Sequence, residues 1–466
     1  MEVIFIKNKT LQEWLPIKEI DKKGVVKLKN NNLIKIIKVN PINYNLKSDL
    51  EKESILNSYK IFLKTCNFDI QILIQSNKED LSHHINNIQN NISKKENNYL
   101  EKISKNYIQY INKINSERKS SSKDFYIIIS NENKKNNNIQ TEELLKNDLK
   151  EKYFKIKECL SRTGNLVQEI SSKENIEKLV FSILNEIKKL KKGGRIIENI
   201  KNLINEKIKK IINKKEDDNF FFFFLEEKDL ISPSYINLKN PRYIEIDNLY
   251  YSGLIIVDYF REQNDLILKN LIETNINMNI SIFYELQDNY KTIRDLTYHI
   301  TNVGVDLKEG NQNRQDIDLA AFTYNDAKYI RREIQINNED IYFLYIYIDV
   351  FSKSSEEQEY LLNKIEGIIE SSGMQTRRAN FRQEQVYLAC MPIAENNKYL
   401  KNASARNVLT TGLCATYPFI SSSIFDENGI FFGSNIYNNS LVFIDRYNTS
   451  KYKNANMCIF GTSGSR

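Results

Sequence analysis

Hydrophobic and polar residues alternate in the first part of the chain in a way that predicts a small α+β unit. Two β-rich runs, "GVVKLKN" and "LIKIIKV", are joined by the polar "NNN", which is a hairpin signal. Ser48 and Glu51 form an S-x-x-E capping box ahead of an amphipathic helical run. In "DIQILIQ", Ile70, Ile72 and Ile74 occupy one face of a strand, since side chains alternate between the two faces. The predicted order is β-β-α-β.

The pattern becomes mainly helical after this unit. Helices are expected within residues 86–118, over Thr141–Leu160 and over Ser171–Leu190, with the strand "FYIIIS" between the first two. Ser171 and Glu174 make a second capping box at the start of the last helix.

Residues 187–218 carry the densest positive charge of the sequence. Lysines between Lys188 and Lys215 accompany apolar residues at helical spacing. One interpretation is a basic amphipathic helix that binds an anionic membrane or DNA. The other, which is the commoner outcome, is a helix that buries its apolar stripe and leaves the lysines in water. The polar "KKEDDN" then marks a boundary.

A second module is predicted from the phenylalanine run 220–224 onward. This run fits a strand covered on both faces, or a segment inserted into a membrane or a partner. Near the end of the module, "DIYFLYIYIDVF" reads as a long strand, and Ser354 with Glu357 caps the helix that Gly373 closes. Strand-like "QTRRANF" and "QVYLACMPI" follow. The β-α-β order favours a split βαβ, ferredoxin-like unit.

Composition adds the class of protein. The 466 residues are 41% hydrophobic and 27% charged, as in soluble globular proteins of two or three domains. The 67 basic and 60 acidic residues give a net charge of +7, a mild excess that suits an anionic membrane or nucleic acid equally. We find no signal peptide, and no apolar run approaches the roughly 20 residues that span a bilayer. A cytoplasmic location is expected.

Cysteine and histidine offer little chemistry. The 5 cysteines are far apart and lack C-x-x-C spacing, so neither a disulfide framework nor a zinc site is expected. The adjacent His83 and His84 have no third ligand at metal spacing and are interpreted as surface residues.

The sequence ends in "NANMCIFGTSGSR", which matches part of the phosphate-loop pattern G-x-x-x-x-G-K-[ST]. Gly461 fits the first glycine, residues 462–465 fill the free positions, and Arg466 stands where the second glycine belongs. "MCIF" suits a buried parallel strand, and the glycines would let backbone N–H groups face phosphate oxygens. Alternatively, "GTSGS" is a polar tail.

Three further features precede this loop in a fixed order. They are a D-x-x-G-I-x-x-G-x-N segment from Asp426 to Asn435, an "FID" before a polar loop, and N-x-N before "MCIF". In this order, residues 409–466 resemble the lead-in to the ATPase domain of the VirB-type (TraC/TraE-like) ATPases of conjugative type IV secretion systems. Upstream, "EWLPIKEI", the stretch from "KVNPINYNLK" to "DIQILIQS", and "FYIIIS" are similar to the TraC-like N-terminal module. "RRANFRQEQVYLACMPIAENN" is similar to a family segment ending at "MP".

This resemblance implies a nucleotide site. Members of the family hydrolyse ATP with Mg²⁺, as homo-oligomers at the cytoplasmic face of the membrane, to power channel assembly or DNA and protein transfer. The resemblance implies a partial nucleotide loop made of Gly461, Thr462, Ser463, Gly464 and Ser465. The loop lysine, the hydroxyl that binds Mg²⁺ and the acidic strand residue would all lie beyond residue 466. We therefore expect this chain to be inactive as it stands, to bind no ATP or Mg²⁺, and to hold no catalytic or metal-binding residue.

The resulting fold prediction is mixed α+β. It comprises two N-terminal modules of ferredoxin-like (split βαβ) character and then the first strands of a RecA-like P-loop ATPase domain. The expected divisions are a TraC-like module over 1–190, a basic helical linker over 191–218, a second α/β module over 219–408 and an incomplete ATPase domain over 409–466.

Two functions fit these observations. In the first, the chain is the N-terminal, non-catalytic part of a conjugative-transfer ATPase, cut within the nucleotide loop, that docks to the channel complex. In the second, it is a stand-alone scaffold, adaptor or interfering fragment without ATPase activity. Expected partners are type IV secretion channel proteins, with the inner membrane surface and, through the basic helix, DNA as further candidates. The expected location is cytoplasmic and peripheral to the cell membrane.

Overall fold

The computed structural model describes most of the chain in separate stretches. These are residues 14–78, 81–93, 98–117, 121–131, 142–184, 233, 235–247, 249–259, 266–309, 314–426, 428–436, 438–449, 452–458 and 460–461. The basic stretch 187–218 and the phenylalanine run 220–224, with the interpretations attached to them, lie outside the described residues.

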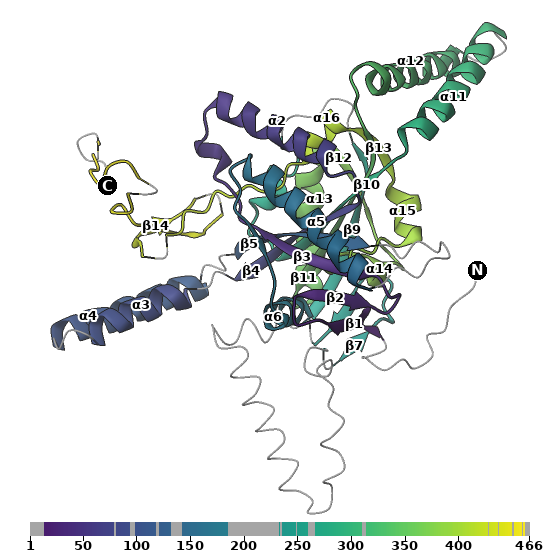
Figure 1. Cartoon of the computed structure of the whole chain (residues 1–466). Coiled ribbons are helices and arrows are strands. Elements are labelled where there is room, and N and C mark those ends of the chain that lie inside the picture. The colour runs from purple at the N-terminus through teal and green to yellow at the C-terminus, as the bar shows by residue number, and fades with distance from the viewer. Residues whose placement is uncertain are drawn as a thin grey trace, which may run out of the picture.

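One large antiparallel sheet dominates the fold (Figure 1). Within the described residues it has 13 strands in the order β1-β2-β3-β5-β4-β10-β11-β9-β8-β7, while β6 pairs with β3, β12 with β9 and β13 with β11. The strands are β1 (Ile17–Ile20), β2 (Val25–Leu28), β3 (Leu33–Val39), β4 (Ile70–Lys78), β5 (Ser121–Asn131), β6 (Val167–Glu169), β7 (Ile236–Asn237), β8 (Ile244–Ile246), β9 (Leu249–Tyr259), β10 (Met278–Leu286), β11 (Ile341–Ser352), β12 (Met374–Arg378) and β13 (Arg406–Leu409).

Helices connect these strands, and a small separate hairpin follows the sheet. The helices are α2 (Asp49–Thr65), α3 (Ser82–Ser93), α4 (Asn98–Glu117), α5 (Glu142–Ser161), α6 (Lys173–Leu184), α10 (Lys269–Ile272), α11 (Asn289–Glu309), α12 (Arg314–Ile336), α13 (Ser355–Ser371), α14 (Gln383–Ala389), α15 (Lys398–Ser404) and α16 (Thr410–Leu413). The hairpin consists of β14 (Ile430–Ser434) and β15 (Leu441–Ile444).

The two halves of the sheet repeat one order of elements. In the first half, the hairpin β2–β3 is followed by α2, β4, the helix pair α3–α4, β5, α5 and β6. In the second half, β8–β9 is followed by α10, β10, the helix pair α11–α12, β11, α13 and β12. The halves meet where β4 pairs with β10, with Ile72 opposite Ile282. The strand order thus reads the same from either edge, which defines an approximate twofold axis through this pair of strands.

Each half therefore carries a helical arm between its equivalent central strands. We call the pair Ser82–Glu117 the α3–α4 arm and the pair Asn289–Ile336 the α11–α12 arm. The two arms lie on opposite sides of the sheet's centre (Figure 1).

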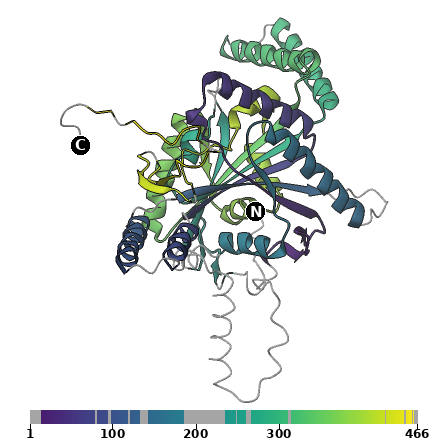
Figure 2. The same cartoon turned by 60° about the vertical axis from the view of Figure 1, so that its left-hand side comes forward.

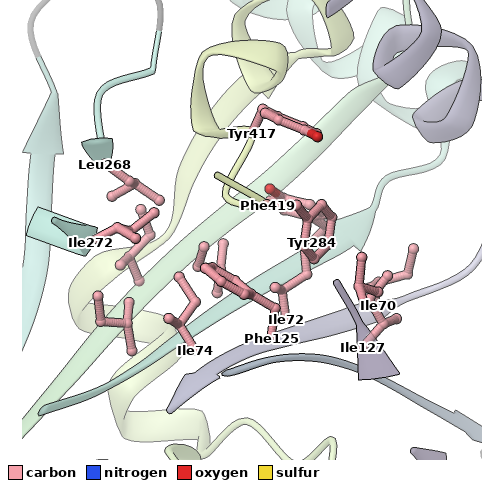
Figure 3. Close-up of a cluster of buried hydrophobic side chains, with 14 of the residues drawn as sticks. Ile70, Ile72, Ile74, Phe125, Ile127, Leu268, Ile272, Tyr284, Tyr417 and Phe419 are labelled. Atoms are coloured by element: carbon pink, nitrogen blue, oxygen red, sulfur yellow. The ribbon is translucent and has the colours of Figure 1, made fainter. Parts of the chain in front are cut away.

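One face of the sheet carries the main hydrophobic core (Figure 3). Ile70, Ile72 and Ile74 of β4 lie on this face, as their alternation predicts. In the first half α2 and α5 cover it, and in the second half α10 and α13 do so. The segment around Tyr417 and Phe419 closes the core over the join between the halves. Equivalent elements thus bury the same face in both halves.

The opposite face is also covered, which explains the unbroken apolar runs in the central strands. Leu73, Tyr126 and Ile128 pack there with α6, while Val386 of α14 packs against β9 and β11. In β11 all but one residue are buried, because helices cover both faces of this central strand.

The capping box predicted at Ser48 and the serine cap predicted at Ser354 are both confirmed. The Glu51 N–H donates to Ser48 Oγ at 3.4 Å, and the Ser48 N–H donates to the Glu51 carboxylate at 2.9 Å. Hydrogen bonding from Ser48 and Lys47 lowers the pKa of Glu51 to about 2. Ser354 likewise accepts from the Glu357 N–H at 3.2 Å. Both serines satisfy N–H groups that have no partner inside the helix.

The capping box at Ser171 and Glu174 is wrong by one residue. Helix α6 begins at Lys173, and Ser172 Oγ accepts from the Asn175 N–H at 3.3 Å.

The strand expected in "QVYLACMPI" is wrong as well. The first part of this run is the end of helix α14, which buries Val386, Tyr387 and Ala389. Val386 packs on Gly253 of β9, so tertiary contact outweighs the local strand preference of a valine–tyrosine pair.

The mixed α+β class is confirmed by this arrangement of one antiparallel sheet with helices on both faces. Strands from the expected modules 1–190 and 219–408 join in that single sheet. The sequence boundaries at 190, 218 and 408 stay predictions.

Candidate functional site

The predicted nucleotide loop lies almost wholly outside the described residues. Residues 462–465 are not described, and Gly461 is exposed and belongs to no helix or strand. Met457, Cys458 and Phe460 are exposed too, and Phe460 is 92% exposed. An apolar run without strands on either side would leave its backbone groups unpaired. The described part of the run therefore does not form the buried strand that precedes a phosphate loop.

The lead-in segment 426–435 folds into the small hairpin. The Asp426 carboxylate accepts from the Asp445 N–H at 2.8 Å and from the Tyr452 hydroxyl at 3.0 Å. At Gly429 a β-carbon would lie 2.7 Å from a backbone nitrogen of β15, so only glycine fits this close approach. The aspartate and the first glycine of the D-x-x-G pattern thus have structural roles in the hairpin.

The hairpin packs against the α3–α4 arm, and both views show the two side by side (Figures 1 and 2). Four buried apolar side chains meet there: Leu81 just before α3, Ile111 of α4, and Leu441 and Phe443 of β15. Partly buried residues surround them: Ile85, Tyr107, Ile114, Phe425 and Phe431. We call this contact the arm–hairpin junction.

His84 belongs to the junction, which corrects its interpretation as a surface residue. It is 5% exposed, and its ring lies 4.5 Å from that of Phe443, between centroids. Its Nε2 is 3.1 Å from the Tyr107 hydroxyl. Nearby, Asn87 Nδ2 donates to Asn428 Oδ1 at 3.1 Å across 341 residues of sequence. That separation explains why the sequence pattern gave no sign of the junction.

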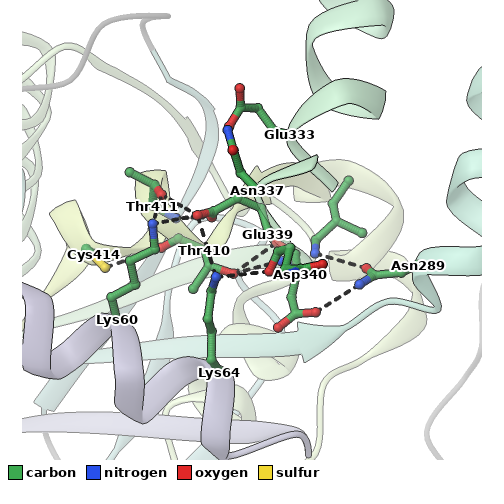
Figure 4. Close-up of polar contacts among 12 residues, drawn as sticks. Lys60, Lys64, Asn289, Glu333, Asn337, Glu339, Asp340, Thr410, Thr411 and Cys414 are labelled. Atoms are coloured by element: carbon green, nitrogen blue, oxygen red, sulfur yellow. Dashed lines mark hydrogen bonds and ion pairs between the residues drawn. The ribbon is translucent and has the colours of Figure 1, made fainter. Parts of the chain in front are cut away.

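A cluster of polar side chains around Glu339 joins α2 of the first half of the sheet to the second half (Figure 4). Glu339, before β11, accepts from the backbone N–H and the hydroxyl of Thr411, each at 2.8 Å. Lys60 of α2 lies 2.5 Å from the same carboxylate, and Lys64 donates to the Asn338 carbonyl at 2.9 Å. Burial raises the pKa of Glu339, but bonds from Lys60 and Thr411 outweigh it and lower the pKa below its ordinary value. The network fixes α2 to the second half.

The side chain of Gln71, on β4, makes another contact between the two halves, and the sequence pattern did not predict it. Its Nε2 donates to Ser281 Oγ at 2.9 Å and to the carbonyls of Ala389 and Met391 at 3.0 and 2.8 Å. Its Oε1 accepts from the Ala394 N–H at 2.7 Å. One buried side chain thus anchors the "ACMPIA" segment of the second half to the first half.

A cavity of about 350 Å³ lies beside this anchor. Glu285 and Lys401 line it and are joined at 2.7 Å, and Asn30 donates to Glu395, whose pKa burial raises. These pairs fasten the cavity wall.

Lys123, at the start of β5, has the most strongly shifted pKa of the lysines among the described residues. Its Nζ donates to Ser76 Oγ at 2.5 Å and to the Ile276 carbonyl at 3.0 Å. Burial lowers its pKa to about 7. Ser76 in turn donates to the Met278 carbonyl at 2.5 Å, so this group secures the end of the β4–β10 pair.

Neither a metal cluster nor a membrane span is found in the described part of the chain. No three His, Cys, Asp or Glu side chains there could hold a metal ion together. None of the described helices is long and apolar enough to cross a bilayer. The five cysteines are free thiols, and all but Cys458 are buried.

Comparison with known families gives one match. Residues 18–186 match the archaeal TraC-like domain. The matched segment runs from β1 through the end of α6, and thus includes the α3–α4 arm. It supports a TraC-like, conjugation-related protein. A comparison with curated proteins finds no match. The second half of the sheet repeats the topology of the matched half, although it lies outside the match.

Proposed function

We propose that this chain is the N-terminal, non-catalytic part of a conjugative-transfer ATPase of the VirB type, and that it docks to the secretion channel at the cytoplasmic face of the membrane. The observation that carries the proposal is the arm–hairpin junction. There, the segment that resembles the lead-in to such an ATPase domain is buried against the segment that matches the TraC-like domain. Two independent resemblances to conjugation proteins thus meet in one folded contact.

The α11–α12 arm supports a docking role. Phe322, Tyr329 and Ile336 are 56%, 60% and 65% exposed and recur every seven residues along α12. This spacing aligns side chains along one side of a helix, as in helices that pack on a partner helix. We propose that this stripe contacts a helix of a channel protein.

Transfer assays test the proposal. In a strain carrying the conjugative element that encodes this chain, deletion of the gene is expected to abolish DNA transfer, and the wild-type gene is expected to restore it. Unchanged transfer after deletion would refute the function.

The docking stripe is tested separately in the same strain. The variant Phe322→Ser/Tyr329→Ser/Ile336→Ser is expected to fold normally and to lower transfer at least about tenfold, because the stripe loses its apolar contacts with the partner helix. Tyr360→Ser, which removes a 65% exposed tyrosine from α13, is the matched control and is expected to transfer normally. Normal transfer by the triple variant would exclude the stripe as the docking surface.

Membrane contact is tested with purified protein and vesicles. Flotation with vesicles containing phosphatidylserine at low salt is expected to carry the chain upward, and to fail with neutral vesicles. Failure with both would remove the membrane from the proposal.

A further inference from the structure

The α3–α4 arm buries its apolar side against the hairpin rather than against the large sheet. Of the arm's described side chains, His84 and Ile111 are buried, and both lie at the arm–hairpin junction with Leu81, which directly precedes α3. Among the described residues, the buried apolar contacts of the hairpin are with the α3–α4 arm and not with the equivalent α11–α12 arm, so this contact breaks the internal symmetry of the fold.

Neither side of this contact has a sufficient core of its own. A two-stranded hairpin is marginally stable in water, and isolated helices depend on packing of an apolar face. Leu441 and Phe443 of β15 cover the apolar side of the arm. In return, Leu81 and Ile111 cover the apolar side of the hairpin. Their stabilities are therefore expected to be linked.

The hairpin also holds the chain that follows it. The Asp426 carboxylate joins the N–H of Asp445, at the end of β15, to the hydroxyl of Tyr452. The Tyr452 N–H donates to the Asn448 carbonyl at 2.9 Å. These two bonds tie Tyr452 to the hairpin.

We propose that the α3–α4 arm and the segment 424–452 form one cooperative unit that opens and closes as a whole while the large sheet stays folded. The hairpin then acts as a coupling element: a force on the chain beyond Tyr452 is transmitted to the arm through Phe443. This coupling is a property of the chain and does not depend on the proposed function.

Hydrogen exchange of the full chain tests the coupling. Phe443→Ala removes the ring that contacts His84 and is expected to speed amide exchange on the order of a hundredfold in both β15 and the α3–α4 arm. Amides of β10 and β11 are expected to keep their wild-type rates. Phe432→Ala is the matched control: Phe432 lies where the register of β14 shifts, between Phe431 and Gly433, and its side chain is 44% exposed. The substitution is expected to leave exchange in both elements unchanged.

The reciprocal variant makes the test strict. Ile111→Ala, on the arm, is expected to speed exchange in β15 as well as in α4, because linked elements destabilise each other equally. Exchange that rises only in the element carrying the substitution would overturn the proposal, and so would an equal rise in β10 and β11. If Phe443→Ala prevents folding, the milder Phe443→Leu is measured against the same outcomes.

Discussion

The carboxylate of Glu339 accepts two hydrogen bonds from Thr411, one from its backbone N–H and one from its hydroxyl, each at 2.8 Å. Glu339 lies before β11 and Thr411 follows β13, so this contact closes the end of the pair formed by those strands. Lys60 brings α2 of the first half to the same carboxylate. The side chain of Glu339 is 3% exposed, and each of its oxygens has a donor. It is therefore a point where loss of one group affects three elements.

Glu339→Ala is expected to lower the free energy of unfolding by about 3 kcal/mol, because a buried charged network loses its acceptor. Glu370→Ala removes an exposed glutamate from α13 and is expected to change stability by no more than about 0.5 kcal/mol. Urea denaturation at pH 7 measures both. Equal effects of the two substitutions would show that the Glu339 network adds nothing to stability.

The same network gives a pH dependence with a defined sign. The pKa of Glu339 is lower in the folded chain than its ordinary value of 4.5, so the folded state favours the ionised form. The resulting stability is present above pH 4.5 and is lost as the pH falls through the folded pKa. The stability difference between wild type and Glu339→Gln is therefore expected to shrink from pH 7 to pH 3 in thermal unfolding. A constant difference would contradict this.

Gln71→Ala is expected to cost roughly 3 kcal/mol, because it leaves the carbonyls of Ala389 and Met391 and the N–H of Ala394 without their bonds inside the protein. Exchange of the Ala394 amide should rise together with the loss of stability. Gln375→Ala, at an exposed position of β12, is the control and is expected to be neutral. A loss below about 1 kcal/mol would mean that water replaces the glutamine.

The sequence anticipated those features that depend on neighbouring residues. The alternation in β4 and the serine caps at Ser48 and Ser354 follow from local geometry, and both are confirmed. The strand β11 and the helix α5 also fall within a few residues of their expected positions.

Features set by distant contacts were not predicted. The two halves share an order of elements rather than a repeated motif, so the internal duplication is visible only in the sheet. The burial of His84 depends on Phe443, and the helical form of α14 depends on Gly253. In each case the partner lies far away in the sequence. The nucleotide loop stays a prediction, because its residues after Gly461 are outside the described part.

A second pH effect is expected from Lys123, whose pKa is shifted by burial rather than by hydrogen bonds. Its pKa is lowered by burial to about 7 from 10.5, so between these values the unfolded chain binds a proton that the folded chain does not. Stability from this group therefore rises with pH from about 7 to 10.5. Lys123→Met cannot titrate and is expected to lose that rise. Thermal unfolding from pH 7 to 10 measures the difference, and parallel curves for the two proteins would refute the lowered pKa.

Gly253 shows how tightly β9 and α14 pack, because a β-carbon there would lie 2.6 Å from Cγ1 and 2.7 Å from Cβ of Val386. Gly253→Ala is expected to destabilise the fold by about 1–3 kcal/mol through overpacking. Gly367→Ala is the matched control, because that glycine is inside helix α13 with nothing within 4 Å of the added carbon. There the same substitution is expected to stabilise by about 0.5–1 kcal/mol.

A double-mutant cycle separates contact from backbone effects at this site. In Gly253→Ala/Val386→Ala the shorter side chain relieves part of the clash, so the loss is expected to be smaller than the sum of the single losses by about 1 kcal/mol. Additive losses would place the cost of Gly253→Ala in the conformation of β9 itself and would refute overpacking against Val386. Denaturant unfolding of the four proteins, with unchanged slopes, distinguishes these outcomes.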